Sequence, residues 1–222
     1  MQAGRDFEVR NGKTYFYRSF DPIKEFTRKW TPQQNHNLSV TGGNRTTTYN
    51  ISLSYLSQKG VMKFNTDKYD RYTLHSNITT NVTKWWRVRS NILFTRSVND
   101  QPYRFTSGQY DAWFYLLRWP RWYPYADYEG KPFRSAVTDI KAGNRESLTS
   151  TYLRANLGTE LNPLKNMTVN FDYTFGYVND ATKRNGGRVT AYDMFATAPF
   201  SNYRDLYGST HDRVIQQSSY TL

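Results

Sequence analysis

The feature that most constrains this chain is a strict alternation of apolar and polar residues over 166–177. Side chains of a strand point alternately to opposite faces, so the pattern predicts a strand with one face in an apolar medium and one in water. Residues 153–161 repeat the alternation, and 162–165 joins the two stretches as a short turn, which predicts a long hairpin. The apolar positions of the second strand are Met167, Val169, Phe171, Tyr173, Phe175 and Tyr177.

The same alternation recurs along the chain and predicts a meander of about seven strands. Residues 1–32 form a weakly patterned lead-in, in which 15–17 fits a strand and 21–26 fits a short helix with Pro22 at its first position. Residues 33–222 are predicted to be one β-domain. Besides 153–161 and 166–177, its alternating stretches are 37–43, 48–57, 72–82, 86–94 and 216–222.

Short turns alternate with longer connections along this meander. The two longest excursions, 99–147 and 180–213, leave one end of the sheet, and tight turns near 43–46, 83–85 and 162–165 leave the other. The strands run to roughly 10 residues, as a tilted membrane crossing needs, whereas soluble strands centre on about 5 to 6. Short turns on one rim and long loops on the other are typical of outer-membrane barrels. We expect an all-β fold, an antiparallel meander forming part of a transmembrane β-barrel with long extracellular loops.

Charged and aromatic residues are placed as such a barrel requires. From Tyr49 onward the apolar faces carry no Lys, Arg, Asp or Glu, although 22% of the chain is charged. Aromatic residues bracket aliphatic ones, as Tyr49 and Tyr55 do around Ile51 and Leu53, which fits girdles at two membrane interfaces. A soluble sandwich also keeps charge off its core face, so it stays an alternative. The charges lie on the other face, at Arg87, Arg89, Arg154, Glu160 and Asp172.

Composition and spacing exclude several kinds of chemistry. The chain has no cysteine and no run approaching the roughly 20 apolar residues of a membrane-spanning helix. Its three histidines, His36, His75 and His211, have no second ligand at metal-binding spacing, and acidic residues form no useful pair. The Asn-x-Ser/Thr triplets are explained by polar–apolar alternation rather than by glycosylation. We therefore expect no enzyme activity, no metal and no cofactor.

The excursion over 99–147 is rich in aromatic residues and arginine, and 111–118 fits a short helix that Pro120 ends. Its aromatic and arginine side chains suit packing within the loop, contact with a ligand through sugar stacking and carboxylate binding, or single-stranded nucleic acid. The net charge of +12 invites the last, but we expect no nucleic-acid partner. If any residues here contact a ligand, we predict Trp113, Arg118, Trp119, Arg121, Trp122 and Tyr123.

Several motifs in order resemble one family. QNHNLSVTGG at 34–43 and TYNISLSYLSQKG at 48–60 resemble the start of the barrel in SusC/RagA-type TonB-dependent outer-membrane transporters of the Bacteroidetes. KYDRYTL at 68–74 is similar to that family's next strand, and TKWWRV at 83–88 to its following turn. LLRWPRWYP at 116–124 resembles its Arg-containing, proline-rich loop. The resemblance covers most of 33–222 and is specific as an ensemble.

The resemblance implies a nutrient importer of the cell outer membrane. Family members have a plug domain inside a barrel of about 22 strands and import oligosaccharides or oligopeptides. They draw energy from TonB and its inner-membrane motor, contact outer-membrane lipid and lipopolysaccharide, and are covered by a SusD-like lipoprotein. About seven strands cannot seal a barrel in lipid, because two sheet edges stay open. We therefore expect this chain to be an internal piece of a longer polypeptide.

Two other functions compete with this interpretation. A soluble or surface-attached β-sandwich that binds glycan without transport would show the same alternation, and it would be soluble without detergent. A basic nucleic-acid-binding module would show DNA affinity that falls steeply with salt.

Overall fold

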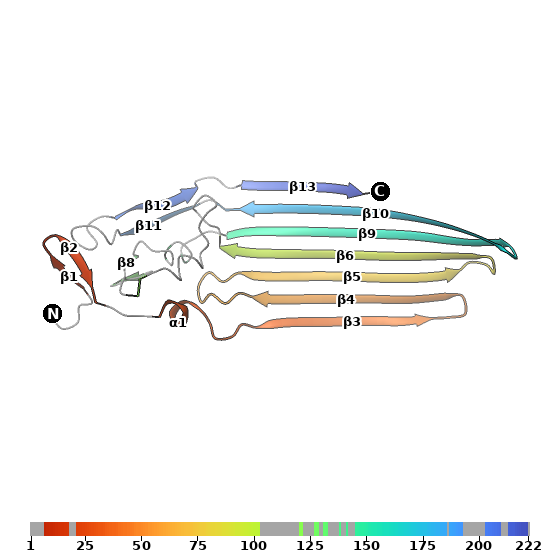
Figure 1. Cartoon of the computed structure of the whole chain (residues 1–222), viewed down its shortest axis with the longest axis horizontal. Helices are drawn as coiled ribbons and strands as arrows, with labels where there is room; N and C mark the ends of the chain where they lie inside the picture. Colours follow the sequence, from red (N-terminus) through yellow and green to blue (C-terminus); the bar gives the residue numbers. More distant parts are fainter. Residues whose placement is uncertain are drawn as a thin grey trace.

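The computed structural model describes residues 7–17, 21–102, 120–121, 127–128, 131–132, 138, 141, 145–185, 187–192, 203–209 and 213–221. Its main feature is a seven-stranded antiparallel sheet in the order β13-β10-β9-β6-β5-β4-β3 (Figure 1). Strands that follow one another in the sheet also follow one another along the chain, apart from short strands inside the long connections. The predicted all-β antiparallel meander is therefore confirmed. Its strands are β3 (Gln33–Gly43), β4 (Thr47–Lys59), β5 (Lys68–Asn81), β6 (Trp86–Pro102), β9 (Arg145–Leu164), β10 (Met167–Arg184) and β13 (Arg213–Thr221).

Smaller elements gather at the end of the sheet from which the longer connections leave (Figure 1). We call this the loop end. The elements are three two-stranded sheets and one short helix. They are β1 (Phe7–Arg10) with β2 (Lys13–Phe16), β7 (Asp127–Tyr128) with β8 (Lys131–Pro132), β11 (Gly187–Tyr192) with β12 (Tyr203–Ser209), and α1 (Pro22–Phe26).

The connections of the large sheet follow the predicted pattern. Turns at 44–46, 82–85 and 165–166 close one end, which we call the short-turn end. Connections at 60–67, 103–144 and 185–212 leave the loop end. In the first turn, Asn44 Oδ1 accepts hydrogen bonds from the backbone nitrogens of Thr46 (2.9 Å) and Thr47 (2.8 Å), which is a common way for Asn to form a turn. The β9–β10 hairpin extends past its neighbours at the short-turn end (Figure 1).

Several strands are longer than the sequence predicted. Strand β6 has 17 residues, β9 has 20 and β10 has 18, so 99–102, 145–147 and 180–184 belong to strands and not to the excursions. The reason is that the backbone ladder continues where the hydrophobic alternation stops. Past Tyr72 and Phe94, the positions on the apolar side hold Asp70 and Arg96, although both remain paired in the sheet.

The lead-in contains the predicted helix. Asp21 caps α1, because its Oδ1 accepts hydrogen bonds from the backbone nitrogens of Ile23 (3.0 Å) and Lys24 (3.4 Å), and Pro22 occupies the first helical position. The strand expected at 15–17 lies slightly earlier, as β2. The helix predicted over 111–118 lies outside the described residues.

The sheet is a single layer in the described part of the chain. The buried hydrophobic side chains there are Phe26, Met62 and Ala191, and each of the three lies outside the seven long strands. By contrast, large apolar side chains of the sheet are exposed, including Leu53 at 51% and Phe171 at 63%. A folded domain that leaves so much apolar surface uncovered needs another apolar medium or partner to contact it.

Candidate functional site

The strand register sorts the side chains of the sheet onto two faces. Leu53 pairs with Leu74, and Phe94 pairs with both Leu74 and Leu153, so residues of one kind line up across neighbouring strands. One side, the apolar face, carries Leu38, Val40, Tyr49, Ile51, Leu53, Tyr55, Tyr72, Leu74, Ile78, Val88, Ile92, Phe94, Leu153, Leu157, Phe171, Tyr173, Phe175, Tyr177 and Tyr220. The side chains that alternate with these form the polar face.

Aromatic rings bound the apolar face at both ends. Near the loop end, the rings of Tyr55 and Tyr72 stack at 4.9 Å, and those of Tyr177 and Tyr220 lie 5.1 Å apart. At the short-turn end, Trp86 Nε1 donates a hydrogen bond to Thr159 Oγ1 (2.8 Å). Between these ends the apolar positions of the described strands hold no Lys, Arg, Asp or Glu. Amphipathic rings flanking an uncharged band are the arrangement found at membrane interfaces.

A row of amide side chains crosses the polar face. Asn50, Asn77, Asn91, Asn156 and Thr174 stand in register across five neighbouring strands. Asn91 Nδ2 donates to Asn77 Oδ1 (2.6 Å), and Asn156 Nδ2 donates to Thr174 Oγ1 (2.8 Å). Amides offer donors and acceptors without net charge. The row can therefore bind the amide groups of a peptide or the hydroxyls of a sugar.

Toward the short-turn end, the charges of the polar face are paired. Arg89 Nη2 lies 3.6 Å from Asp172 Oδ1, and Arg87 Nη1 lies 3.6 Å from Glu160 Oε2. Arg87 Nε also donates to Asn81 Oδ1 (3.0 Å). These side chains are 23% to 52% exposed, so solvent screens each pair and it contributes little to stability, but the charges cancel along this part of the face.

Two arginines on the polar face have no partner within the described residues. Arg71 and Arg154 are exposed, and neither forms an ion pair or hydrogen bond within the described part of the chain. Arg154 lies opposite Gly176, where an added Cβ would first meet Thr221 at 3.4 Å. Gly176 therefore adds no side chain at the position paired with Arg154. An anionic group, such as a peptide carboxylate, fits this position by charge.

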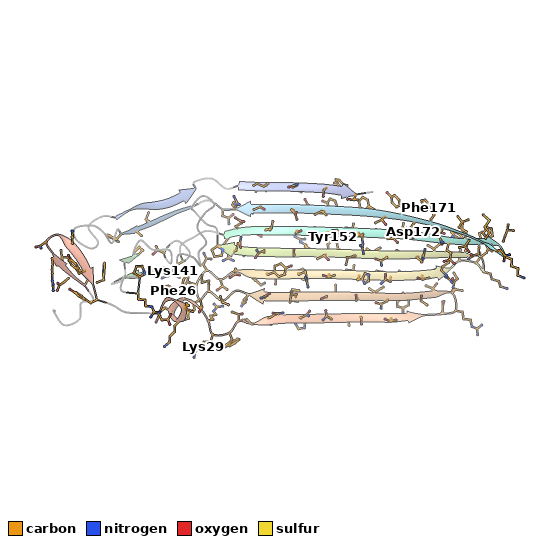
Figure 2. The ribbon with its side chains drawn as sticks, viewed as in Figure 1. Phe26, Lys29, Lys141, Tyr152, Phe171 and Asp172 are labelled. Carbon is orange, nitrogen blue, oxygen red and sulfur yellow. The ribbon has the colours of Figure 1, made fainter. Side chains whose placement is uncertain are left out.

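At the loop end, the lead-in is fixed to the connection between β4 and β5. Phe26, the last residue of helix α1, lies at the loop end in Figure 2 and is 2% exposed. Its ring centroid lies 5.9 Å from that of Phe64. The backbone nitrogen of Lys63 donates to Phe26 O (2.9 Å), and that of Arg28 donates to Val61 O (2.8 Å). A small apolar cluster and a short backbone ladder therefore hold α1 against 60–67.

Arg145 ties the same connection to the middle of the sheet. Its Nη1 donates to Asn65 Oδ1 (2.7 Å), Asn65 O (3.2 Å) and Thr66 O (3.1 Å). Its Nε and Nη2 donate to Oδ1 and O of Asp100, both at 3.0 Å. One guanidinium thus joins β6, β9 and 60–67, and the planar fork of arginine suits this geometry.

A second ion pair lies at the loop end of β5, beyond the aromatic rings and outside the apolar band. Lys68 Nζ lies 2.7 Å from Asp70 Oδ2, and Tyr55 Oη donates to Asp70 Oδ1 (3.1 Å). Burial raises the pKa of the Asp70 carboxyl, but hydrogen bonds from Lys68, Ser57 and Tyr55 outweigh burial and hold that pKa below its ordinary value. The hydrogen bond to Asp70 raises the pKa of Lys68. Both groups are therefore charged at neutral pH.

The sheet resembles part of the RagAB peptide importer. A chain of that importer in a "closed-closed" state superposes with a TM-score of 0.61 at 19% identity, over 82% of this chain and 21% of that one. A chain of the RagAB peptide transporter superposes with a TM-score of 0.60 at 19% identity, over 80% and 21% respectively. This chain thus spans about a fifth of those chains, and at such identity the likeness establishes the fold. No protein-family model and no curated protein matches the sequence.

The predicted ligand residues fall almost wholly outside the described residues, as is the case for Trp113, Arg118, Trp119, Trp122 and Tyr123. Arg121 is described, in an exposed turn. Ligand contact by this group stays a prediction. The sequence analysis placed Arg154 on the polar face, but it missed the amide row, Arg71, and the lack of a partner for either arginine within the described residues. The only sequence signal for the amide row was one Asn at a polar position in each of four alternating stretches. Whether these four Asn side chains line up depends on the strand register.

The described part of the chain contains neither a metal-binding cluster nor a membrane-spanning helix. No group of three or more His, Cys, Asp and Glu side chains there is placed to hold a metal ion. The one described helix, α1, is too short to cross a membrane.

Proposed function

We propose that this chain is a wall segment of an outer-membrane active importer of the SusC/RagA type, which takes up oligopeptides or oligosaccharides. The apolar face contacts lipid, and the polar face lines the lumen. The loop end lies on the extracellular side, where the longer connections, including the predicted ligand residues, meet the ligand.

The observation that carries the proposal is the uncovered apolar face with aromatic rings at its two ends. A soluble sandwich packs a second sheet about 10 Å above such a face, and its apolar side chains are then buried. Here Leu38 is 65% exposed and Leu157 is 53% exposed, on strands long enough to cross a bilayer. The likeness to stretches of RagAB chains adds support at the level of the fold.

The resemblance extends the proposal to partners. A SusD-like lipoprotein covers the extracellular mouth, and TonB with its inner-membrane motor supplies energy through parts of the protein outside this chain. We propose that the chain itself performs no catalytic step, needs no cofactor and binds no nucleic acid.

Peptides are the ligand class that we place first. The structures with the same fold are described as a peptide importer and a peptide transporter. The polar face offers a row of amides that can pair with peptide groups, and Arg154, which has no partner within the described residues, can pair with a carboxylate.

Alanine at Trp119 and Trp122 in the full-length protein is expected to lower peptide uptake. Unchanged uptake with normal surface expression would remove these two residues from the ligand site.

Membrane fractionation of the full-length protein tests the proposal. We expect the protein in the outer-membrane fraction, resistant to extraction by salt and carbonate and released by detergent. Recovery as a monomer without detergent would contradict the proposal and favour the soluble glycan-binding sandwich. In such a soluble sandwich, a second layer of protein would cover the apolar face.

A further inference from the structure

A histidine adjoins the amide row of the polar face. His75 lies on β5, two residues before Asn77, and Asn77 Nδ2 lies 3.3 Å from His75 Nε2. An amide nitrogen only donates, so Nε2 accepts this hydrogen bond and the proton of the neutral ring is on Nδ1. Asn91 Nδ2 in turn donates to Asn77 Oδ1 (2.6 Å). These three side chains form a chain of hydrogen bonds in which each donor points toward His75. We call them the histidine relay.

The two halves of the amide row donate in opposite directions. Asn91 on β6 donates toward β5, whereas its register partner Asn156 on β9 donates toward β10, from Nδ2 to Thr174 Oγ1 (2.8 Å). Both nitrogens are therefore used away from the boundary between β6 and β9. Asn91 Oδ1 is buried and has no hydrogen-bond partner within the described residues, and Asn156 Oδ1 has none there either. Because an unpaired buried acceptor is costly, this boundary requires a donor.

The histidine relay can reverse its direction only as a unit. Turning the Asn91 amide alone would set its Oδ1 against Asn77 Oδ1, and turning Asn77 alone would set its Oδ1 against His75 Nε2. A second proton on His75 imposes the full reversal, because Nε2 then carries hydrogen and only donates. Asn77 Oδ1 accepts that hydrogen, Asn77 Nδ2 donates to Asn91 Oδ1, and Asn91 Nδ2 becomes available to Asn156 Oδ1.

We propose that His75 is a positioning residue whose proton decides whether the amide row offers an acceptor to a ligand. The inference rests on the proposed function, in which the row binds peptide groups. With His75 neutral, Asn156 Oδ1 is open to a hydrogen-bond donor of the ligand, such as a backbone N–H. With His75 protonated, Asn91 Nδ2 takes that oxygen, and the amides from Asn77 to Asn156 all donate toward β10. Acid therefore weakens the binding of a ligand that donates to the row.

The neighbours of His75 on the polar face contain no acid. Ser52 faces it from β4 and Leu93 faces it from β6. No Asp or Glu occupies a polar-face position of β4, β5 or β6. The nearest charged side chains of this face are arginines, namely Arg71, Arg89 and Arg154. Histidine is the side chain whose charge changes between about pH 5 and pH 8, so we expect the relay to reverse over that range.

The test measures peptide binding at pH 8 and at pH 5, with the full-length protein in neutral detergent micelles. The probe is N-acetyl-trialanine amide, which has no titrating group, and its affinity is measured by calorimetry. We expect the affinity of the wild-type protein to fall about fivefold from pH 8 to pH 5, which corresponds to the loss of one hydrogen bond.

Two glutamine substitutions show whether His75 is the group that titrates. His75→Gln keeps a donor and an acceptor but does not titrate, so it should retain binding with less than a twofold difference between the two pH values. His36→Gln is the matched control, because His36 lies on the apolar face, where it pairs with Tyr55 on β4. This variant should keep the fivefold fall of the wild-type protein. Equal pH profiles in His75→Gln and wild-type protein would overturn the inference.

A third substitution separates the relay from the direct effect of a charge on the ring. Asn77→Ala interrupts the relay and leaves His75 in place, so the fivefold fall should disappear. If the fall is retained in Asn77→Ala, His75 acts on the ligand through its charge and the inference is wrong.

Nitrogen-15 NMR of the imidazole groups tests the direction of the relay without a ligand. The His75 signal is identified by its absence from His75→Gln, and it should show the proton on Nδ1 at pH 8 and on both nitrogens at pH 5. A proton on Nε2 at pH 8 would overturn the inference, because the relay would already be reversed. Peptide that binds at neither pH contradicts the proposed function and the inference with it, whereas peptide that binds equally at both overturns the inference alone.

Discussion

The Arg89 guanidinium and the Asp172 carboxylate meet 3.6 Å apart across an intervening strand, and the residue between them is Gly158. A side chain at position 158 would fill the space in which they meet. An added Cβ would lie 2.4 Å from Asp172 Oδ1 and 3.2 Å from Arg89 Nε. The glycine therefore permits an ion pair between strands that are not neighbours, and the pair cancels charge on the polar face.

Replacing Gly158 by alanine should force Asp172 out of its position and break the ion pair. We expect the free energy of unfolding to fall by about 1 kcal/mol, from an unfavourable rotamer and the loss of an exposed pair. Gly176→Ala is the matched control, because its Cβ would meet Thr221 at an ordinary 3.4 Å. Urea titration of the full-length protein in lipid vesicles measures both. Equal effects of the two substitutions would contradict the role given to Gly158.

Arg145 should decide how firmly 60–67 is held. Arg145→Met removes the donors to Asn65, Thr66 and Asp100, so we expect the local opening of 60–67 to become easier by about 2 kcal/mol. Amide hydrogen exchange in this connection would then speed up roughly 30-fold. Arg154→Met removes an exposed, unpaired arginine of the same strand and should leave this exchange unchanged. Slow exchange retained in Arg145→Met would show that other contacts hold the connection.

The lead-in should depend on a single buried ring. Phe26→Ala opens a cavity beside Phe64, and we expect a local loss of about 3 kcal/mol in the free energy of unfolding. The helix α1 should then detach while the long strands persist. Tryptic cleavage at Lys24 and Arg28 in folded protein reports this. Ile23→Ala is the control, because this side chain of the same helix is 55% exposed. In the Ile23→Ala variant, tryptic cleavage at Lys24 and Arg28 should stay slow. Equal cleavage in both variants would contradict an anchoring role for Phe26.

Much of the fold could be predicted from local patterns. The alternation from Tyr49 to Tyr55 fixes both the strand and the face that each side chain takes, since the period of a strand is two. Asp21 followed by Pro22 predicts the start of α1, because capping and a fixed φ act within one turn. The ends of the strands could not be predicted. Toward the loop end from Tyr72, the backbone hydrogen bonds of the sheet continue through the charged residues Asp70 and Lys68. Backbone pairing does not depend on the side chain, so the sequence pattern does not show where it ends.

The site could be predicted only in outline. The sequence placed Arg87, Arg89, Glu160 and Asp172 on the polar face, but their pairing depends on the register of three strands. Arg145 binds Asn65 across 80 residues of chain, a contact that no local pattern reports.

The most direct test of the lipid-facing apolar face is a cysteine scan of β4, in which no cysteine of this segment competes for the label. Spin labels are placed singly at Ile51, Ser52, Leu53 and Ser54 in the full-length protein in lipid vesicles, and collisions with oxygen and with a water-soluble nickel chelate are measured. We predict that labels at 51 and 53 meet oxygen and not nickel, and that labels at 52 and 54 meet nickel. Labels at 51 and 53 that meet nickel as often as their neighbours, or that meet neither reagent, would contradict the account.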